Sequence, residues 1–141
     1  MHRALIRTLT TALVLGAVCA CDNDDDREIA FIPGVDTGVL VQGWTIEGTR
    51  DPAKCAQYGA DRMRVVIFSG EGEVDATEFA PCSAFEVRLT LLTERYTGNA
   101  TFLDANGAPV SATLPIPAFP ILDDVTTAQS IDFPAAAMQR P

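Results

Sequence analysis

The stretch Phe85-Glu86-Val87-Arg88-Leu89-Thr90-Leu91 decides the fold class of this 141-residue chain. Apolar and polar residues alternate in it at a period of two, as in a β-strand with one face in a core and the other in water. The residues expected to face the core are Phe85, Val87, Leu89 and Leu91. The residues expected to face solvent are Glu86, Arg88 and Thr90.

The same signal recurs from residue 39 onward, where β-branched and aromatic residues stand between turn residues. Further strands are expected at 39–46, 63–68, 96–103, 110–116 and 128–133. Short strands without long helices indicate an all-β fold. The expected architecture is an antiparallel β-sandwich of about seven strands with one short helix.

One turn and one group of prolines constrain the second half of the chain. Asp104-Ala105-Asn106-Gly107 is expected to be a hairpin turn, because Asn-Gly adopts the positive φ angles that primed turns require. The prolines that follow are Pro115, Pro117 and Pro120. Because proline cannot donate to a ladder, this region is expected at a sheet edge or in an extended connection.

The short helix is expected at 51–58. Asp51 is placed to cap its amino end, Pro52 stands at the first helical position, and Gly59 ends it. Cys55 lies within this helix, so a bridge from Cys55 would attach the helix to another part of the chain.

The amino-terminal residues have the layout of an export signal. Two arginines precede an apolar stretch at 9–18, which is too short to cross a bilayer core of about 30 Å as a helix. Val18-Cys19-Ala20-Cys21 resembles the lipobox of bacterial lipoproteins, which implies cleavage before Cys21 and lipid on that cysteine. An ordinary signal peptide with chance cysteines is the alternative.

An acidic run, Asp22-Asn23-Asp24-Asp25-Asp26-Arg27-Glu28, follows Cys21 and is typical of a solvated spacer. Its alternating aspartates resemble the start of an EF-hand loop, but Arg27 and Pro33 stand where that loop needs glycine and glutamate. The expected organisation is a signal peptide at 1–20, a lipid-anchored tether at 21–37, the sandwich at 38–135 and a tail at 136–141.

Cysteine parity supports this organisation. Cys19 leaves with the signal and Cys21 takes the lipid, so Cys55 and Cys82 remain as a pair in an exported protein. We expect a disulfide between them, which would stabilise the fold by about 3.5 kcal/mol in the chain-entropy treatment. Two free buried thiols are the alternative.

Composition excludes several classes of function. Without Arg3 and Arg7 the chain keeps eight basic against 19 acidic residues, a surface that disfavours nucleic acid. The histidine that the sequence contains is His2, inside the signal, so Ser-His-Asp and Cys-His catalysis are not expected. Lys54 is the one lysine. We therefore expect no enzymatic activity, no catalytic residue, no cofactor and no dedicated metal site.

Two resemblances extend beyond the lipobox. The run 94–107 is similar to the Tyr-Thr-x-x-Ala-x-Leu-x-Asp-x-x-Gly hairpin of prealbumin-like, carboxypeptidase-regulatory-type sandwiches. The run 44–133 resembles uncharacterised small lipoproteins of myxobacteria and their relatives. The shared motifs are Gly-Trp-Thr-Ile-Glu-Gly, Asp-Pro-Ala-x-Cys, Ala-Pro-Cys-Ser-Ala-Phe and Asp-Phe-Pro. These resemblances imply a sandwich and a lipoprotein, but no activity.

The sequence therefore predicts a lipid-anchored, non-enzymatic interaction or structural module of the bacterial cell envelope. Its membrane is the inner or the outer one, its domain faces the periplasm or cell surface, and its partner is an envelope protein or a polysaccharide. The alternative is a carbohydrate-binding module assisted by calcium. That alternative uses Trp44 and Tyr58 as stacking aromatics and the acidic loops at 71–73 and 123–124 as calcium ligands, although Trp44 is also expected in the core.

Overall fold

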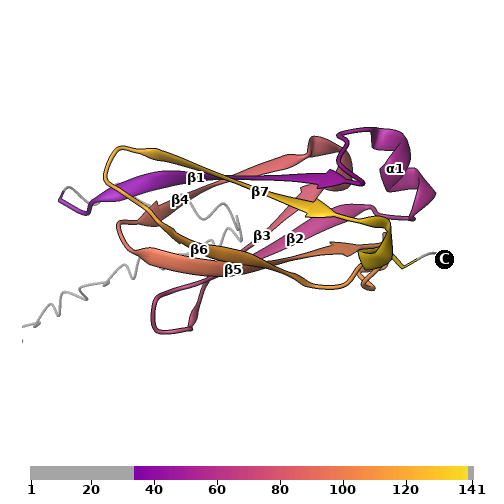
Figure 1. Cartoon of the computed structure of the whole chain (residues 1–141). Helices are drawn as coiled ribbons and strands as arrows, with labels where there is room; N and C mark the ends of the chain where they lie inside the picture. Colours follow the sequence, from indigo (N-terminus) through magenta and orange to yellow (C-terminus); the bar gives the residue numbers. More distant parts are fainter. Residues whose placement is uncertain (1–33, 140–141) are drawn as a thin grey trace, which may run out of the picture. The chain divides into compact units, whose positions relative to one another are not determined.

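A computed structural model describes residues 34–139 as two facing β-sheets with a short helix at one end (Figure 1). The strands are β1 (Thr37–Ile46), β2 (Arg62–Phe68), β3 (Val74–Pro81), β4 (Glu86–Leu92), β5 (Arg95–Leu103), β6 (Leu114–Pro120) and β7 (Thr126–Phe133). The helical elements are α1 (Pro52–Gln57) and the 3-10 turns η1 (Cys82–Ala84) and η2 (Ala135–Ala137). The expected all-β sandwich with one short α-helix is confirmed.

The strand order is β4-β1-β7 in one sheet and β3-β2-β5-β6 in the other. Neighbouring strands are antiparallel except for β1 and β7, which run parallel from Val39–Thr126 to Ile46–Phe133. The first and last strands of the sandwich therefore lie side by side, with β1 at the centre of its sheet. Sequence periodicity does not reveal this parallel pair.

Inward residues of both sheets form one core. Trp44 in β1 and Met63 and Ile67 in β2 are completely buried. In β4, Leu89 and Leu91 are buried while Arg88 and Thr90 are exposed, as the alternation predicts. Phe85 is buried too, but it precedes β4 with a left-handed backbone (φ 57°), because it ends the η1 turn.

The region 104–120 follows the prediction in part. Of the turn residues, Gly107 alone has a positive φ (84°), so the hairpin uses a type I turn with glycine at the left-handed position instead of a primed turn. The expected strand at 110–116 begins only at Leu114, because Ser111 turns aside to bridge Met138. The proline-rich β6 does form an edge of its sheet, as predicted.

The strand β3 has no counterpart in the sequence prediction. It is the opposite edge of the four-stranded sheet, and most of its residues are exposed. With little burial on either face, no strict alternation of apolar and polar residues is needed. Its signal is weaker: Val74, Thr77 and Phe79 are residues that favour strands, directly after the tight turn 69–73.

The boundaries of the sandwich extend slightly beyond those expected. At the start, β1 begins at Thr37. At the end, Met138 is buried against the core, and the N–H of Gln139 donates to Val110 O (2.8 Å). The predicted signal peptide, Cys21 and the tether up to residue 33 lie outside the described residues. No helix between residues 34 and 139 is long and apolar enough to cross a membrane.

Candidate functional site

A disulfide joins Cys55 in α1 to Cys82 in η1, with Cα atoms 6.0 Å apart, which confirms the expected pair. Both cysteines are buried. The indole Nε1 of Trp44 donates a hydrogen bond to Cys82 O (3.0 Å), so the bridge is also fixed to β1, near the carboxyl end of that strand. This arrangement attaches the helix to both sheets.

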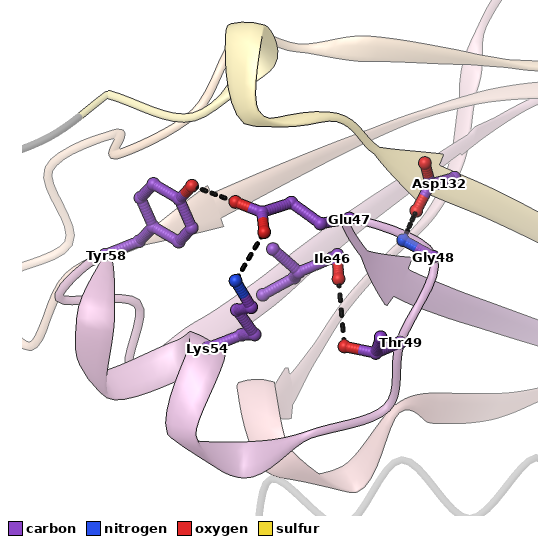
Figure 2. Close-up of polar contacts among 7 residues, drawn as sticks. All are labelled: Ile46, Glu47, Gly48, Thr49, Lys54, Tyr58 and Asp132. Carbon is purple, nitrogen blue, oxygen red and sulfur yellow. Dashed lines mark hydrogen bonds and ion pairs between the residues drawn. The ribbon is translucent and has the colours of Figure 1, made fainter.

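A polar cluster lies beside the disulfide, where β1 leads into α1. The Glu47 carboxylate accepts hydrogen bonds from the Lys54 ammonium and the Tyr58 hydroxyl, both of which point toward it from the helix (Figure 2). Glu47 itself has a left-handed backbone (φ 50°). We name Glu47, Lys54 and Tyr58 the α1 corner.

Two further sets of contacts hold the corner in place. Asp51 caps α1 by accepting from Ala53 N–H (2.9 Å), as the sequence predicts. In the neighbouring strand of the same sheet, Asp132 of β7 accepts from Thr45 Oγ1 (2.7 Å) and Gly48 N–H (2.8 Å), as Figure 2 shows for Gly48. The turn after β1 is therefore bonded to β7 on one side and to α1 on the other.

The contacts of the α1 corner hold α1 against the end of β1. The hydrogen bond to Glu47 raises the pKa of Lys54 against the opposing effect of burial, so its amine stays protonated and is not a nucleophile at neutral pH. Tyr58 has no exposed surface, and three-quarters of the Lys54 side chain is covered. Sequence reasoning did not single out Glu47; its signal was the Glu-Gly pair at the end of a strand.

The residues expected to serve a carbohydrate site do not form one. Trp44 and Tyr58 are both fully buried, which removes the aromatic platform on which that interpretation rested. The acidic residues of the loops at 71–73 and 123–124 are exposed. Within residues 34–139 no three Asp, Glu, Cys or His side chains gather in a way that could hold a metal ion.

A different surface combines exposed apolar and basic groups. Phe79, on the edge strand β3, has 52% of its surface exposed, and the Arg62 guanidinium lies 5.7 Å from the centre of its ring. These two residues line a hollow of about 250 Å³ together with Asp61, Ala80 and Pro81. Arg64 pairs with Phe79 across the ladder and so shares its face of the sheet.

The two arginines of this surface have no acidic partner among the described residues. The ion pairs found between residues 34 and 139 are Lys54–Glu47 and Arg88–Glu86, and neither involves Arg62 or Arg64. The Nε atoms of both arginines are buried, and neither has a hydrogen-bond partner among the described residues. In a chain of formal net charge −9, two arginines therefore lie side by side without an ion pair to the described residues, with Asp61 as the acidic residue of the same hollow. We name Arg62, Arg64 and Phe79 the β3 surface.

Comparisons with known proteins add little. No family model matches the sequence, and no curated protein matches it. A leucine-rich repeat protein from Bacteroides thetaiotaomicron is a structural match with a TM-score of 0.49 and 11% sequence identity. The match covers 71% of this chain and 12% of the other, a likeness too distant to carry an argument about fold or function.

Proposed function

We propose that this protein is a lipid-anchored, non-enzymatic interaction module of the bacterial cell envelope. The observation that carries the proposal is the β3 surface. There an exposed aromatic ring on the edge strand β3 shares one face of the sheet with two arginines of the neighbouring strand β2, and these arginines have no ion pairs to the described residues. Aromatic side chains and arginine are enriched where proteins bind other proteins.

Two features support the address. The Cys55–Cys82 disulfide fits an oxidising compartment, since such bonds persist outside the cytosol. The same bond occupies both cysteines of the sandwich and leaves Cys21, the lipobox cysteine, to take lipid. Two or more acyl chains on Cys21 would anchor the chain stably, because each buried methylene contributes about 0.8 kcal/mol.

Fractionation of cells expressing the full chain tests the anchor. We expect the protein in the membrane fraction, with a mass increase on the fragment that begins at Cys21, and we expect Cys21→Ser to release it. A chain that stays soluble, or that keeps residues 1–20 without lipid, would overturn the proposal. Cys19→Ser is the matched control and should change neither the location nor the mass of the mature protein.

A further inference from the structure

The backbone of β3 offers hydrogen-bonding groups that face away from the sheet. Cys82 N–H donates to Asp61 O (2.9 Å), and the next pair along the ladder is Arg62–Pro81. Bonded and non-bonded pairs alternate in an antiparallel ladder, so Phe79 and Thr77 occupy non-bonded positions. Their N–H and C=O groups therefore point outward from the edge.

The other edge of the same sheet, β6, is not suited to pairing with an added strand. In β6 the residues Pro115, Pro117 and Pro120 have no N–H to donate, whereas β3 has proline only at its last position, Pro81. Of the two edges of this four-stranded sheet, β3 is the one that can accept an added strand over Thr77 and Phe79.

The β3 surface also specifies the side chain that such a strand would carry. A residue opposite Phe79 on an added strand would lie on the same face as Phe79 and Arg64, beside the ring over which the Arg62 guanidinium lies. Two cations without ion pairs to the described residues select a carboxylate at that position. Asp61, at the rim of the hollow, opposes this attraction with a charge of the same sign as the carboxylate.

We propose that β3 binds an extended segment of a partner protein by strand addition, with an acidic side chain opposite Phe79. This inference rests on the proposed function and names the kind of partner that it requires. Backbone bonds from Thr77 and Phe79 supply register, while Arg62 and Arg64 supply selectivity. A polysaccharide offers no peptide groups at strand spacing, so the outward N–H and C=O groups favour a polypeptide.

A second copy of this chain fits the edge less well than a partner with a single acid. In the antiparallel register that pairs Thr77 with Phe79 of the other copy, Glu78 would lie directly opposite Glu78, and like charges in that position are destabilising. Each mature copy, without Arg3 and Arg7, also brings eight basic against 19 acidic residues to the contact.

The test uses the mature lipidated chain, which begins at Cys21, in detergent micelles and a blocked peptide, Thr-Val-Thr-Glu-Thr-Val-Thr. We expect the peptide to shift the NMR amide signals of Thr77 and Phe79 and to slow their hydrogen exchange. The same peptide with a central Lys should bind about tenfold more weakly, and one with a central Gln should lie between them. N-methylation of the central residue should abolish binding.

Variants of the protein separate charge from backbone. Arg62→Gln should remove most of the preference for Glu over Lys, and Asp61→Asn should strengthen binding of the Glu peptide. Thr77→Pro should abolish binding, because it removes an outward N–H. Circular dichroism and unchanged amide signals of Leu40 and Phe102 will show that each variant is folded.

Three results would overturn the inference: no binding of any peptide at millimolar concentration, equal binding of the Glu and Lys peptides, or exchange protection that depends on protein concentration without peptide. The last would assign the edge to a second copy. If the chain is lipidated and membrane-bound, any of these results rejects strand addition but leaves the proposed function standing. If the wild-type chain carries no lipid in the fractionation experiment, the proposed function is rejected, whatever the peptides show.

Discussion

The α1 corner and the β3 surface both combine basic and aromatic side chains, but they differ in whether those side chains are paired within the chain. At the corner, the acid of Glu47 meets Lys54 and Tyr58 within the same chain, and a disulfide lies next to them. At the β3 surface, Arg62 and Arg64 have no acidic partner among the described residues, and Phe79 is half exposed. One region satisfies its polar groups internally and stabilises the domain, while the other keeps binding capacity for a second molecule.

Removal of the disulfide should be the largest disturbance of the corner. Cys55→Ala with Cys82→Ala should lower the free energy of unfolding by about 3.5 kcal/mol, since the bridge closes a loop across a separation of 27 residues. Denaturant unfolding under oxidising conditions measures the loss. Cys21→Ser, measured in the same way, should leave the free energy of unfolding unchanged. A double variant as stable as the wild type would show that the bridge does not stabilise this end.

Trp44→Phe should have the next largest effect. It deletes the hydrogen bond from the indole to Cys82 O and leaves unfilled volume at a fully buried position, for a loss of about 2 kcal/mol. Urea unfolding is the measurement. Because the indole donates to the backbone carbonyl of Cys82, a residue of the bridge, its effect should shrink in the variant that lacks Cys55 and Cys82. Full additivity of the two losses would argue against that coupling.

Glu47→Gln should cost less than either of these changes, because the amide still accepts from Tyr58 and the lost ion pair with Lys54 is partly exposed to water. The pH dependence gives a sharper signal. The pKa of Lys54 is raised in the folded chain above its ordinary value of 10.5, so the ion pair stabilises the fold fully below pH 10.5. That contribution is lost as pH rises through the raised pKa.

Wild type and Glu47→Gln should therefore converge in stability at alkaline pH, as followed by unfolding from pH 8 upward. The difference between the two proteins is the quantity to compare, since burial also raises the pKa of Tyr96, to about 12, and ionisation of Tyr96 destabilises both alike. A gap that stays constant with pH would remove Lys54 from the explanation.

Substitutions at the β3 surface should change stability least. Phe79→Thr should shift the free energy of unfolding by less than about 0.5 kcal/mol, because the side chain is half exposed and threonine also favours strands. Phe102→Ala, at a fully buried position of β5 in the same sheet, is the contrasting control and should cost about 3–5 kcal/mol. A large loss at Phe79 would mean that this ring supports the fold instead of contacting a partner.

Most of the sandwich was predictable because apolar and polar residues alternate with a period of two along half-buried strands. Leu89 and Leu91 alternate with exposed Arg88 and Thr90, and Asp51 with Pro52 marks the start of α1. Cysteine parity gave the Cys55–Cys82 bond. The strand β3 was missed because an edge strand that is exposed along most of its length needs no alternation of apolar and polar residues. The late start of the strand expected at 110–116 depends on the bridge between Ser111 and Met138, which are distant along the chain.

By itself, the sequence predicted the fold class, the short helix and the disulfide pair, because each depends on local pattern or on counting. It left Trp44 open between the core and an exposed aromatic platform, and the structure placed it in the core. Only the tertiary structure decided which strands became edges, the parallel pairing of β1 with β7, and the meeting of Glu47 with Lys54 and Tyr58. It also brought Arg62 over Phe79 from a neighbouring strand. Those features depend on register between segments distant along the chain, which no local pattern encodes.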